Sequence, residues 1–299
     1  MKILPSLKQI EYLIALDAEQ HFGRAADACN VTPSTLSAGI RELESVLGIA
    51  LAERTKRSVL MTPLGRQIAE RGLRLLQDAE EIMALATATR KDPLTGDLHL
   101  GVIPTIGPFL LPRVLPGVWR DYPDLRLYLH EEQTDDLLIK LRRGNIDVAV
   151  IALPYDLGDL EARVLFDDFF QFACSKAHPL ASRERIDATD LEDANLLLLQ
   201  EGHCLRGHAL DACGLKGSDH QGQFAATSFY TLVQMVAANL GCTLLPQLAI
   251  EGGITQVAPL SLIPLARPAS RQIGLAWRRS TYHSREFELL SQELVPYRG

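Results

Sequence analysis

The sequence predicts two unlike parts joined by one long helix: a small winged-helix module of α+β class, followed by a larger α/β region. Apolar residues recur at helical spacing three times within the first 48 residues, and two short strand-like runs follow them. One periodic stretch then extends from residue 63 to about residue 90. From residue 97 onward, strand-like and helix-like segments alternate, which is typical of an α/β region.

The first two helices are predicted by a capping pattern and by small apolar residues. Ser6 and Gln9 form a capping box, in which Ser6 caps the first amides and Gln9 reaches back. A second short helix is expected at about Gly23–Cys29, where three alanines allow close packing.

The third helix begins at a threonine cap followed by proline, and its exposed face suits DNA. Its buried stripe is Leu36, Ile40, Leu43 and Leu47, and Gly48 ends it. Short polar side chains and one arginine on the other face let a helix enter the major groove. The expected DNA-contacting residues here are Thr32, Ser34, Thr35, Ser37 and Arg41.

A cationic turn follows, between Ala50–Glu53 and Val59–Met61, and predicts a two-stranded wing. Its Arg54, Lys56 and Arg57 are expected to contact the phosphate backbone or the minor groove, although the turn could be an ordinary solvated one. The chain of 299 residues has a net charge of −7, yet residues 41–74 hold seven Arg or Lys against four acids. A locally basic module on an acidic chain fits DNA binding by one part only.

Thr62 and Pro63 start the long helix, which is expected to extend to about Arg90 with Gly72 interrupting its apolar period. A helix of this length needs a partner, so a coiled-coil seam between subunits is expected. Residues 91–96 read as a linker. Beyond it, the expected strands are Leu98–Ile103, Leu125–Glu131, Ile146–Leu153 and Gln272–Trp277. The expected helices are Phe109–Trp119, Thr134–Arg143 and Ser284–Leu294, and the last strand and helix are expected to return to the first unit of this region.

Several classes of protein are disfavoured by composition. There is no run of 18 apolar residues, so no membrane span is expected. Gln9 and Glu11 interrupt the apolar start that a secretory signal needs, so a cytoplasmic location is expected. Five cysteines at irregular spacing, without a CxxC pair, predict neither a disulfide framework nor a zinc site. No metal or cofactor is expected, and no hydrolase elbow, P-loop or dinucleotide motif is present.

Five short segments resemble the helix-turn-helix of the LysR-type transcriptional regulators. They are His21–Asp27, Thr35–Ser37, Ile40–Glu44, Leu47–Gly48 and Glu53–Arg54, and the helix entry at Thr62–Gly65 agrees with them. The resemblance implies a DNA-binding domain at residues 1–62, a dimerising linker helix at 63–91 and a regulatory domain at 97–299. That domain would resemble periplasmic binding proteins, with subdomain I at about 97–164 and 269–299 and subdomain II at about 165–268. It also implies a dimer of dimers on double-stranded DNA, with RNA polymerase as a candidate partner.

Within the family, four further segments resemble the OxyR branch, the hydrogen peroxide-sensing activators. They are Gly101–Pro108, Tyr128–Thr134, Glu201–Arg206 and Ala226–Ser228. Cys213 follows Cys204 at the spacing of that branch, so the resemblance implies that Cys204 reacts with peroxide and Cys213 resolves it to a disulfide. It places Thr105, Thr134, His203 and Arg206 around the peroxide pocket.

The sequence departs from these patterns at two places. Thr32-Pro33-Ser34 stands where the family usually has Ser-Gln-Pro, so the usual base-reading glutamine is absent. Gly207 stands where the branch commonly has an acid.

The residues around Cys204 support redox chemistry on physical grounds as well. Leu205–Cys213 is expected to be a short helix, which Gly214 ends. The helix N-terminus, Arg206 and a protonated His203 would each favour the nucleophilic thiolate of Cys204. Nine residues of helix span about 13.5 Å, whereas a disulfide needs Cα atoms within about 7 Å. Oxidation must therefore unwind the helix, and Gly207 would make that easier.

Alternatives stay open at this stage. Cys29, Cys174 and Cys242 are expected to be buried core residues, and His178, His208 and His220 to lie on the surface. Thr105 and Thr134 could be helix caps only. The chain could instead be a LysR-type regulator that binds a small organic effector in the interdomain cleft. A thiol peroxidase or cysteine hydrolase is disfavoured by the DNA-binding part, so no enzyme is expected.

Overall fold

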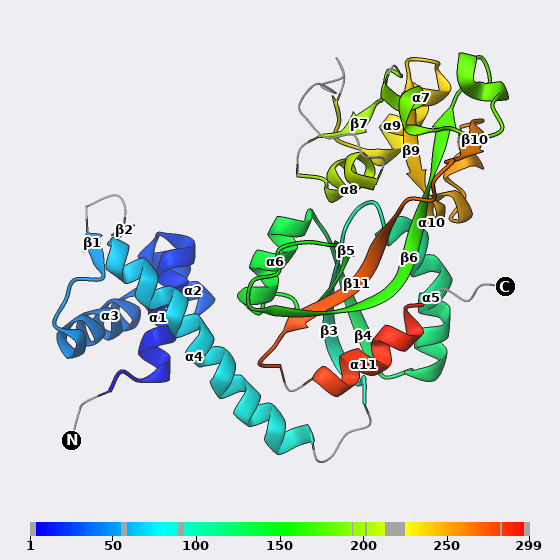
Figure 1. The fold of residues 1–299 in the computed structure, drawn as a ribbon. Helices are drawn as coiled ribbons and strands as arrows, with labels where there is room; N and C mark the ends of the chain where they lie inside the picture. The colour runs from blue at the N-terminus through cyan, green and yellow to red at the C-terminus, as the bar shows by residue number, and fades with distance from the viewer. Residues whose placement is uncertain are drawn as a thin grey trace. The chain divides into compact units, whose positions relative to one another are not determined.

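The computed structural model describes residues 4–54, 59–88, 93–192, 194–200, 202–212, 225–256, 258–281 and 283–295. They belong to two compact units, residues 1–91 and 92–299 (Figure 1). In the described part of the chain, no helix is long and apolar enough to cross a lipid bilayer.

The first unit holds four helices and a two-stranded sheet among its described residues. They are α1 (Leu7–Glu19), α2 (Phe22–Ala28), α3 (Pro33–Leu47), β1 (Ala52–Arg54), β2 (Val59–Met61) and α4 (Pro63–Ala88). The cap predictions are confirmed: Ser6 and Gln9 make the reciprocal capping box, and the Thr32 side chain accepts from the Thr35 amide. Gly48 ends α3 in the left-handed conformation, with φ 70°.

Two glycines explain how closely these helices approach. A Cβ at Gly72 of α4 would lie 2.5 Å from Ile10 Cγ2 of α1, and one at Gly39 of α3 would lie 2.6 Å from the Tyr12 ring. Gly72 therefore interrupts the apolar period because α4 packs against α1 at that point. Leu13 and other apolar residues of α1 and α3 complete the core.

The second unit is built on a seven-stranded sheet with the order β10-β6-β11-β5-β3-β4, in which β9 also pairs with β6. Its strands are β3 (Gly96–Val102), β4 (Leu125–Glu131), β5 (Val148–Leu153), β6 (Leu160–Cys174), β9 (Cys242–Pro246), β10 (Ser261–Pro264) and β11 (Ser270–Arg278). A separate pair is formed by β7 (Leu198–Leu199) and β8 (Ala225–Ala226). The described helices are α5 (Gly107–Asp121), α6 (Thr134–Arg142), α7 (Ala188–Glu192), α8 (Cys204–Ala212), α9 (Phe229–Ala237), α10 (Gln247–Glu251) and α11 (Ser284–Glu293), with 3-10 turns at Pro179–Ser182 and Ile254–Gln256.

Two long strands connect the ends of this unit (Figure 1). β6 pairs with β11 near its start and with β9 and β10 near its end. The last strand and the last helix pack against the first part of this unit, as predicted, because β11 pairs with β5 and α11 contacts α5.

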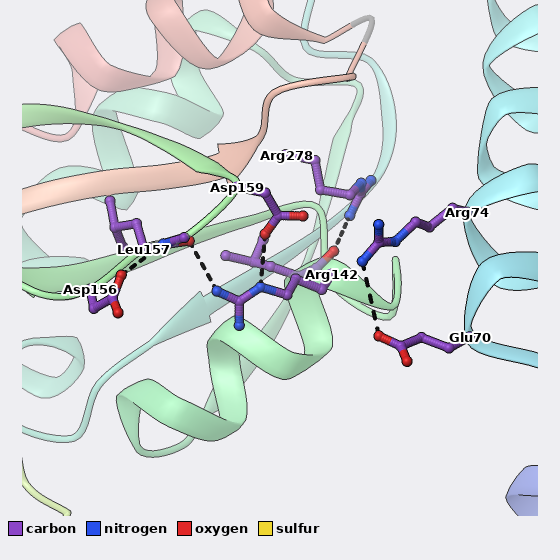
Figure 2. Close-up of polar contacts among 9 residues, drawn as sticks. Glu70, Arg74, Arg142, Asp156, Leu157, Asp159 and Arg278 are labelled. Atoms are coloured by element: carbon purple, nitrogen blue, oxygen red, sulfur yellow. Dashed lines mark hydrogen bonds and ion pairs between the residues drawn. The ribbon is translucent and has the colours of Figure 1, made fainter. Parts of the chain in front are cut away.

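The end of α6 is fixed by two arginines (Figure 2). Arg142 donates to Asp159 Oδ1 at 3.0 Å and to the Leu157 carbonyl at 2.9 Å. Arg278 donates to the carbonyls of Leu141 and Ile146 at 2.8 and 2.9 Å. The Arg278 contacts satisfy backbone carbonyls in and just after the last turn of α6. The Arg142 contacts tie the last residue of α6 to the segment between β5 and β6. Together they hold the end of the helix whose first residue is Thr134.

Candidate thiol pocket and DNA-facing helix

Three chain segments meet around one small cavity in the second unit. It is lined by Ile103, Pro104, Thr105, Gln133, Thr134, Gly202, His203 and Cys204. Its volume is about 10 Å³, which is room for roughly one water molecule. Thr105, Thr134, His203 and Cys204, all expected at a pocket from the sequence, are therefore brought together.

The local fold explains this meeting. Thr105 follows β3 and Thr134 follows β4, and these strands are parallel neighbours whose carboxyl ends lie at the same edge of the sheet. Gly202 brings the third segment close: its φ is +96°, and a Cβ there would lie 2.5 Å from Gln133 Oε1. The positive φ favours glycine at this position, and the absence of a side chain lets Gln133 approach.

A buried cation fixes Thr105. Arg271 is 1% exposed and donates to Thr105 Oγ1 at 3.0 Å and to the Thr105 carbonyl at 3.1 Å. Its charge is balanced by Asp168 at 3.0 Å, which also accepts from the Leu248 amide. Since the Thr105 hydroxyl accepts from Arg271, its own proton remains free to be donated. Thr105 is not the cap of α5, which begins after Ile106 without a side-chain cap.

Thr134 carries an unpaired hydroxyl. The residue is 1% exposed, and its Oγ1 has no hydrogen-bond partner among the described residues. The capping alternative is wrong here too, because α6 has no side-chain cap and Thr134 is its first helical residue. A buried unsatisfied hydroxyl costs about 1–3 kcal/mol, so this atom marks a place where a small hydrogen-bonding molecule would be stabilised.

His203 is held neutral. Burial lowers its pKa from the ordinary value, and a hydrogen bond with the backbone of Thr227 opposes this only in part. The positive charge that a protonated His203 would add is therefore absent at neutral pH. The neutral ring can still accept or donate a proton in the cavity.

Cys204 is the first residue of α8 and is half-buried. The predicted helix is confirmed through Ala212, and Cys213 lies outside the described residues. Arg206 does not line the cavity, because its guanidinium points to the Leu199 carbonyl, 3.5 Å away. The expectation that Arg206 lies at the pocket is therefore corrected.

α8 has few anchors. Leu205 and Ala209 are buried, and His208 Nε2 lies 3.0 Å from the Pro154 carbonyl oxygen. The predicted surface position of His208 is therefore wrong, because this residue is half-buried. Gly207 is exposed, and a Cβ added there would meet no atom within 4 Å. A helix of nine residues is marginal without tertiary contacts, so the stability of α8 depends on these few contacts.

Most of the α3 residues that the sequence predicts to contact DNA are exposed. Ser34, Thr35 and Arg41 are exposed, and Ser37 is half-buried. Thr32 is exposed too, but its hydroxyl is engaged with Ser34 and Thr35 at the helix start. Arg54 ends β1, while its side chain and the whole of Lys56 and Arg57 lie outside the described residues.

Sequence reasoning missed several residues that support the pocket without lining it. Arg271 and Asp168 form the buried ion pair that holds Thr105. Tyr155, whose hydroxyl interacts electrostatically with Cys204, donates to Asp135 at 2.6 Å. Burial and Asp135 raise the pKa of Tyr155, so it stays protonated. Two signals were available in the sequence. Arg271 stands directly before a predicted apolar strand, and Asp168 stands in a pair of aspartates flanked by phenylalanines.

For the other cysteines and histidines, the predictions for the cysteines are confirmed and those for the described histidines are wrong. Cys29, Cys174 and Cys242 are buried, as expected. His178 is half-buried rather than on the surface, because its ring caps a 3-10 turn and contacts Phe172 edge-on. His220 lies outside the described residues. In the part that the structure describes, no group of three His, Cys, Asp or Glu residues could hold a metal.

Comparison with known proteins identifies the family. Residues 7–66 match the bacterial regulatory helix-turn-helix model of the lysR family, and residues 91–297 match the LysR substrate binding domain. The chain belongs to the LysR family of transcriptional regulators. As a LysR-family member it carries a helix-turn-helix for DNA and an α/β regulatory region.

Among LysR-family relatives, two curated proteins are similar over nearly their whole lengths. The transcriptional regulator EstR of Acinetobacter baylyi is 42% identical over 97% of this chain and 96% of its own length. The regulator OxyR of Escherichia coli K12 is 38% identical over 97% and 94%. These relatives are transcriptional regulators rather than enzymes.

Solved structures show the same fold. A cysteine-to-aspartate variant of full-length OxyR from Pseudomonas aeruginosa matches with a TM-score of 0.80 and 36% identity, over 98% of this chain and 95% of that one. A peroxide-bound cysteine-to-serine variant of OxyR from Corynebacterium glutamicum matches with 0.65 and 35%, over 98% and 92%.

Proposed function

We propose that this LysR-family regulator senses hydrogen peroxide through Cys204, forms a disulfide with Cys213, and so controls oxidative-stress genes as an activator. The observation that carries the proposal is the unpaired Thr134 hydroxyl in a cavity of one-water size beside Cys204. Hydrogen peroxide is only one oxygen atom larger than water and can both donate and accept there. The similarity to OxyR proteins supports this choice.

Each residue of the pocket has a separate role in the proposed reaction. The Cys204 thiol first loses its proton, and the thiolate attacks one peroxide oxygen. The O–O bond breaks and Cys204 becomes a sulfenic acid, while the other oxygen leaves as hydroxide and takes up the released proton to become water. The Thr105 hydroxyl, which Arg271 holds as an acceptor, can donate its proton toward the leaving oxygen. Thr134 and neutral His203 complete the set of groups that orient the molecule. The Cys213 thiol then attacks the Cys204 sulfur and releases a second water.

The disulfide step requires α8 to unwind. From Cys204 to Ala212 an intact helix rises about 12 Å, and disulfide-linked Cα atoms lie within about 7 Å. The sulfurs cannot meet while the helix of residues 204–212 persists. Unwinding would break the contact between His208 and Pro154, which links α8 to the segment between β5 and β6. In this way oxidation of one thiol would alter the regulatory region.

The remaining parts of the proposal follow the family architecture. Residues 1–62 would bind double-stranded DNA with α3 and the wing, and residues 63–91 would dimerise. Subdomains I (97–164 and 269–299) and II (165–268) would carry the switch in a dimer of dimers in the cytoplasm. RNA polymerase would be the partner through which the oxidised form activates transcription.

An organic effector beside Cys204 is the weaker alternative. Small-molecule sites usually have volumes of about 300–1,000 Å³, far above the 10 Å³ beside Cys204. A larger cavity of about 410 Å³ lies elsewhere, lined by Arg113, Gln247, Glu251 and residues of β6 and α11. An effector would therefore bind away from the thiol, and inert cysteines would then be expected.

The test treats the full chain with less than one equivalent of hydrogen peroxide and maps cysteines by mass spectrometry, together with footprinting on a target promoter. A Cys204–Cys213 crosslink and a changed footprint are expected, and both should be lost in Cys204→Ser. Cys29→Ser serves as the matched control and should behave as wild type. An intact peroxide response in Cys204→Ser would favour the effector alternative, and sustained peroxide turnover with a reductant would favour an enzyme.

A further inference from the structure

A second pair of cysteines lies in the second unit, away from the thiol pocket. Cys174 ends β6 and Cys242 begins β9, and the register of these antiparallel strands places the two residues directly opposite each other. Directly opposite residues of an antiparallel pair project to the same face of the sheet. Both residues are fully buried.

The hydrogen bonds around Cys242 show which kind of pair this is. The Cys242 amide donates to the Asn195 carbonyl, and the Cys242 carbonyl accepts from the Leu197 amide. Both backbone groups of Cys242 therefore point away from β6 and toward the segment around Leu196, which forms a parallel bridge with Cys242. Cys174 and Cys242 are thus a non-hydrogen-bonded pair, whose Cα atoms lie about 4.5 Å apart. Disulfides span Cα separations of about 4.4–6.8 Å.

We infer that Cys174 and Cys242 are a second redox couple, which hydrogen peroxide converts to a cross-strand disulfide without any change of strand register. One thiol reduces peroxide and becomes a sulfenic acid, with release of water. The other thiol attacks that sulfur and releases a second water, so two S–H bonds and one O–O bond are exchanged for one S–S bond and two O–H bonds. This inference does not rest on the proposed role of Cys204.

The surroundings set the order of events. Burial raises the pKa of both thiols, that of Cys242 to about 12, and the Cys242 thiol lies 3.5 Å from the Asn195 carbonyl as a donor. Thiols held protonated and out of solvent react slowly. The couple should stay reduced during a brief peroxide exposure that oxidises Cys204, and respond only to sustained oxidation.

The position of the couple gives it a structural consequence. The loop between Cys174 and Cys242 contains both Cys204 and Cys213. A Cys174–Cys242 bond would link β6 to β9 covalently at the base of that loop. The pairing of these two strands would therefore persist while the segment of α8 refolds. Severe oxidation would then leave a regulatory region that is harder to unfold.

The test uses the full chain carrying Cys204→Ser and Cys213→Ser, so that failure of the first switch cannot affect the result. The protein is held in excess hydrogen peroxide for hours, with and without sub-denaturing urea, then alkylated and mapped without reduction. A Cys174–Cys242 crosslink is expected, forming faster in urea and raising the melting temperature of the second unit. A further Cys174→Ala substitution should abolish both effects.

Cys29 is the matched control, since it is also buried with a raised pKa but has no cysteine opposite it in a sheet. It should end up reduced or over-oxidised without a crosslink to Cys174 or Cys242. The inference is wrong if Cys174 and Cys242 are recovered as separate sulfinic or sulfonic acids. It is equally wrong if both can still be alkylated after treatment, or if either pairs with Cys29.

Discussion

Replacing Gly207 by alanine should make the Cys204–Cys213 disulfide harder to form. Gly207 lies inside α8, and a Cβ there meets no atom within 4 Å, so the substitution has no steric cost. Alanine stabilises a helix interior by about 0.5–1 kcal/mol relative to glycine. If oxidation has to unwind α8, the disulfide loses this amount. Its equilibrium constant should fall roughly 2- to 5-fold, and the midpoint potential should rise by roughly 10–20 mV.

The assay is a redox titration in glutathione buffers, with the crosslinked fraction measured by alkylation and mass spectrometry. Gly117→Ala is the matched control, because Gly117 lies within α5 and has only Arg120 Nη2 at 4.0 Å from an added Cβ. That variant should leave the potential unchanged. A Gly207→Ala protein whose reduced state is more stable, yet whose potential is unchanged or lower, would refute the coupling of helix to disulfide.

Three further perturbations test the pocket. Thr134→Val removes an unpaired buried hydroxyl, so the free energy of unfolding of the reduced protein should rise by about 1 kcal/mol. The rate of Cys204 oxidation, followed by stopped flow, should fall about tenfold. Lower stability with unchanged reactivity would assign the hydroxyl a structural role. Arg271→Met leaves Asp168 buried without its partner and should cost about 3–5 kcal/mol in chemical denaturation, part of which Asp168→Asn in the same chain should restore. Below its ordinary pKa of 6.5, His203 in the unfolded chain takes up a proton before the folded protein does, because burial lowers the folded pKa. The free energy of unfolding should therefore fall as pH drops below about 6.5 and level off below the folded pKa. A flatter pH profile is expected for His203→Gln, and an equally steep one would exclude His203 as a contributor.

Features encoded within a few residues could be predicted from the sequence. The Ser6–Gln9 box, the Thr32 cap and the Gly48 stop all depend on neighbours within one helical turn. The strand Leu125–Glu131 has its predicted bounds. The meeting of Thr105, Thr134 and Cys204 was expected from the family resemblance, and the parallel pairing of β3 with β4 accounts for part of it.

Features that depend on distant partners could not be predicted. Arg271 can hold Thr105 in the interior only because Asp168, 103 positions earlier, neutralises its charge. β6 has no single period over its 15 residues, since its beginning is partly exposed and its end is fully buried. The opposition of Cys174 and Cys242 requires the strand register, which neither local pattern contains.

Hydrogen exchange across residues 204–212, measured by mass spectrometry before and after stoichiometric peroxide, tests the central claim most directly. The account predicts that the amides of α8 lose protection in the same molecules that acquire the Cys204–Cys213 crosslink, while those of β5 and β11 keep theirs. Crosslinked molecules in which α8 remains protected would contradict it.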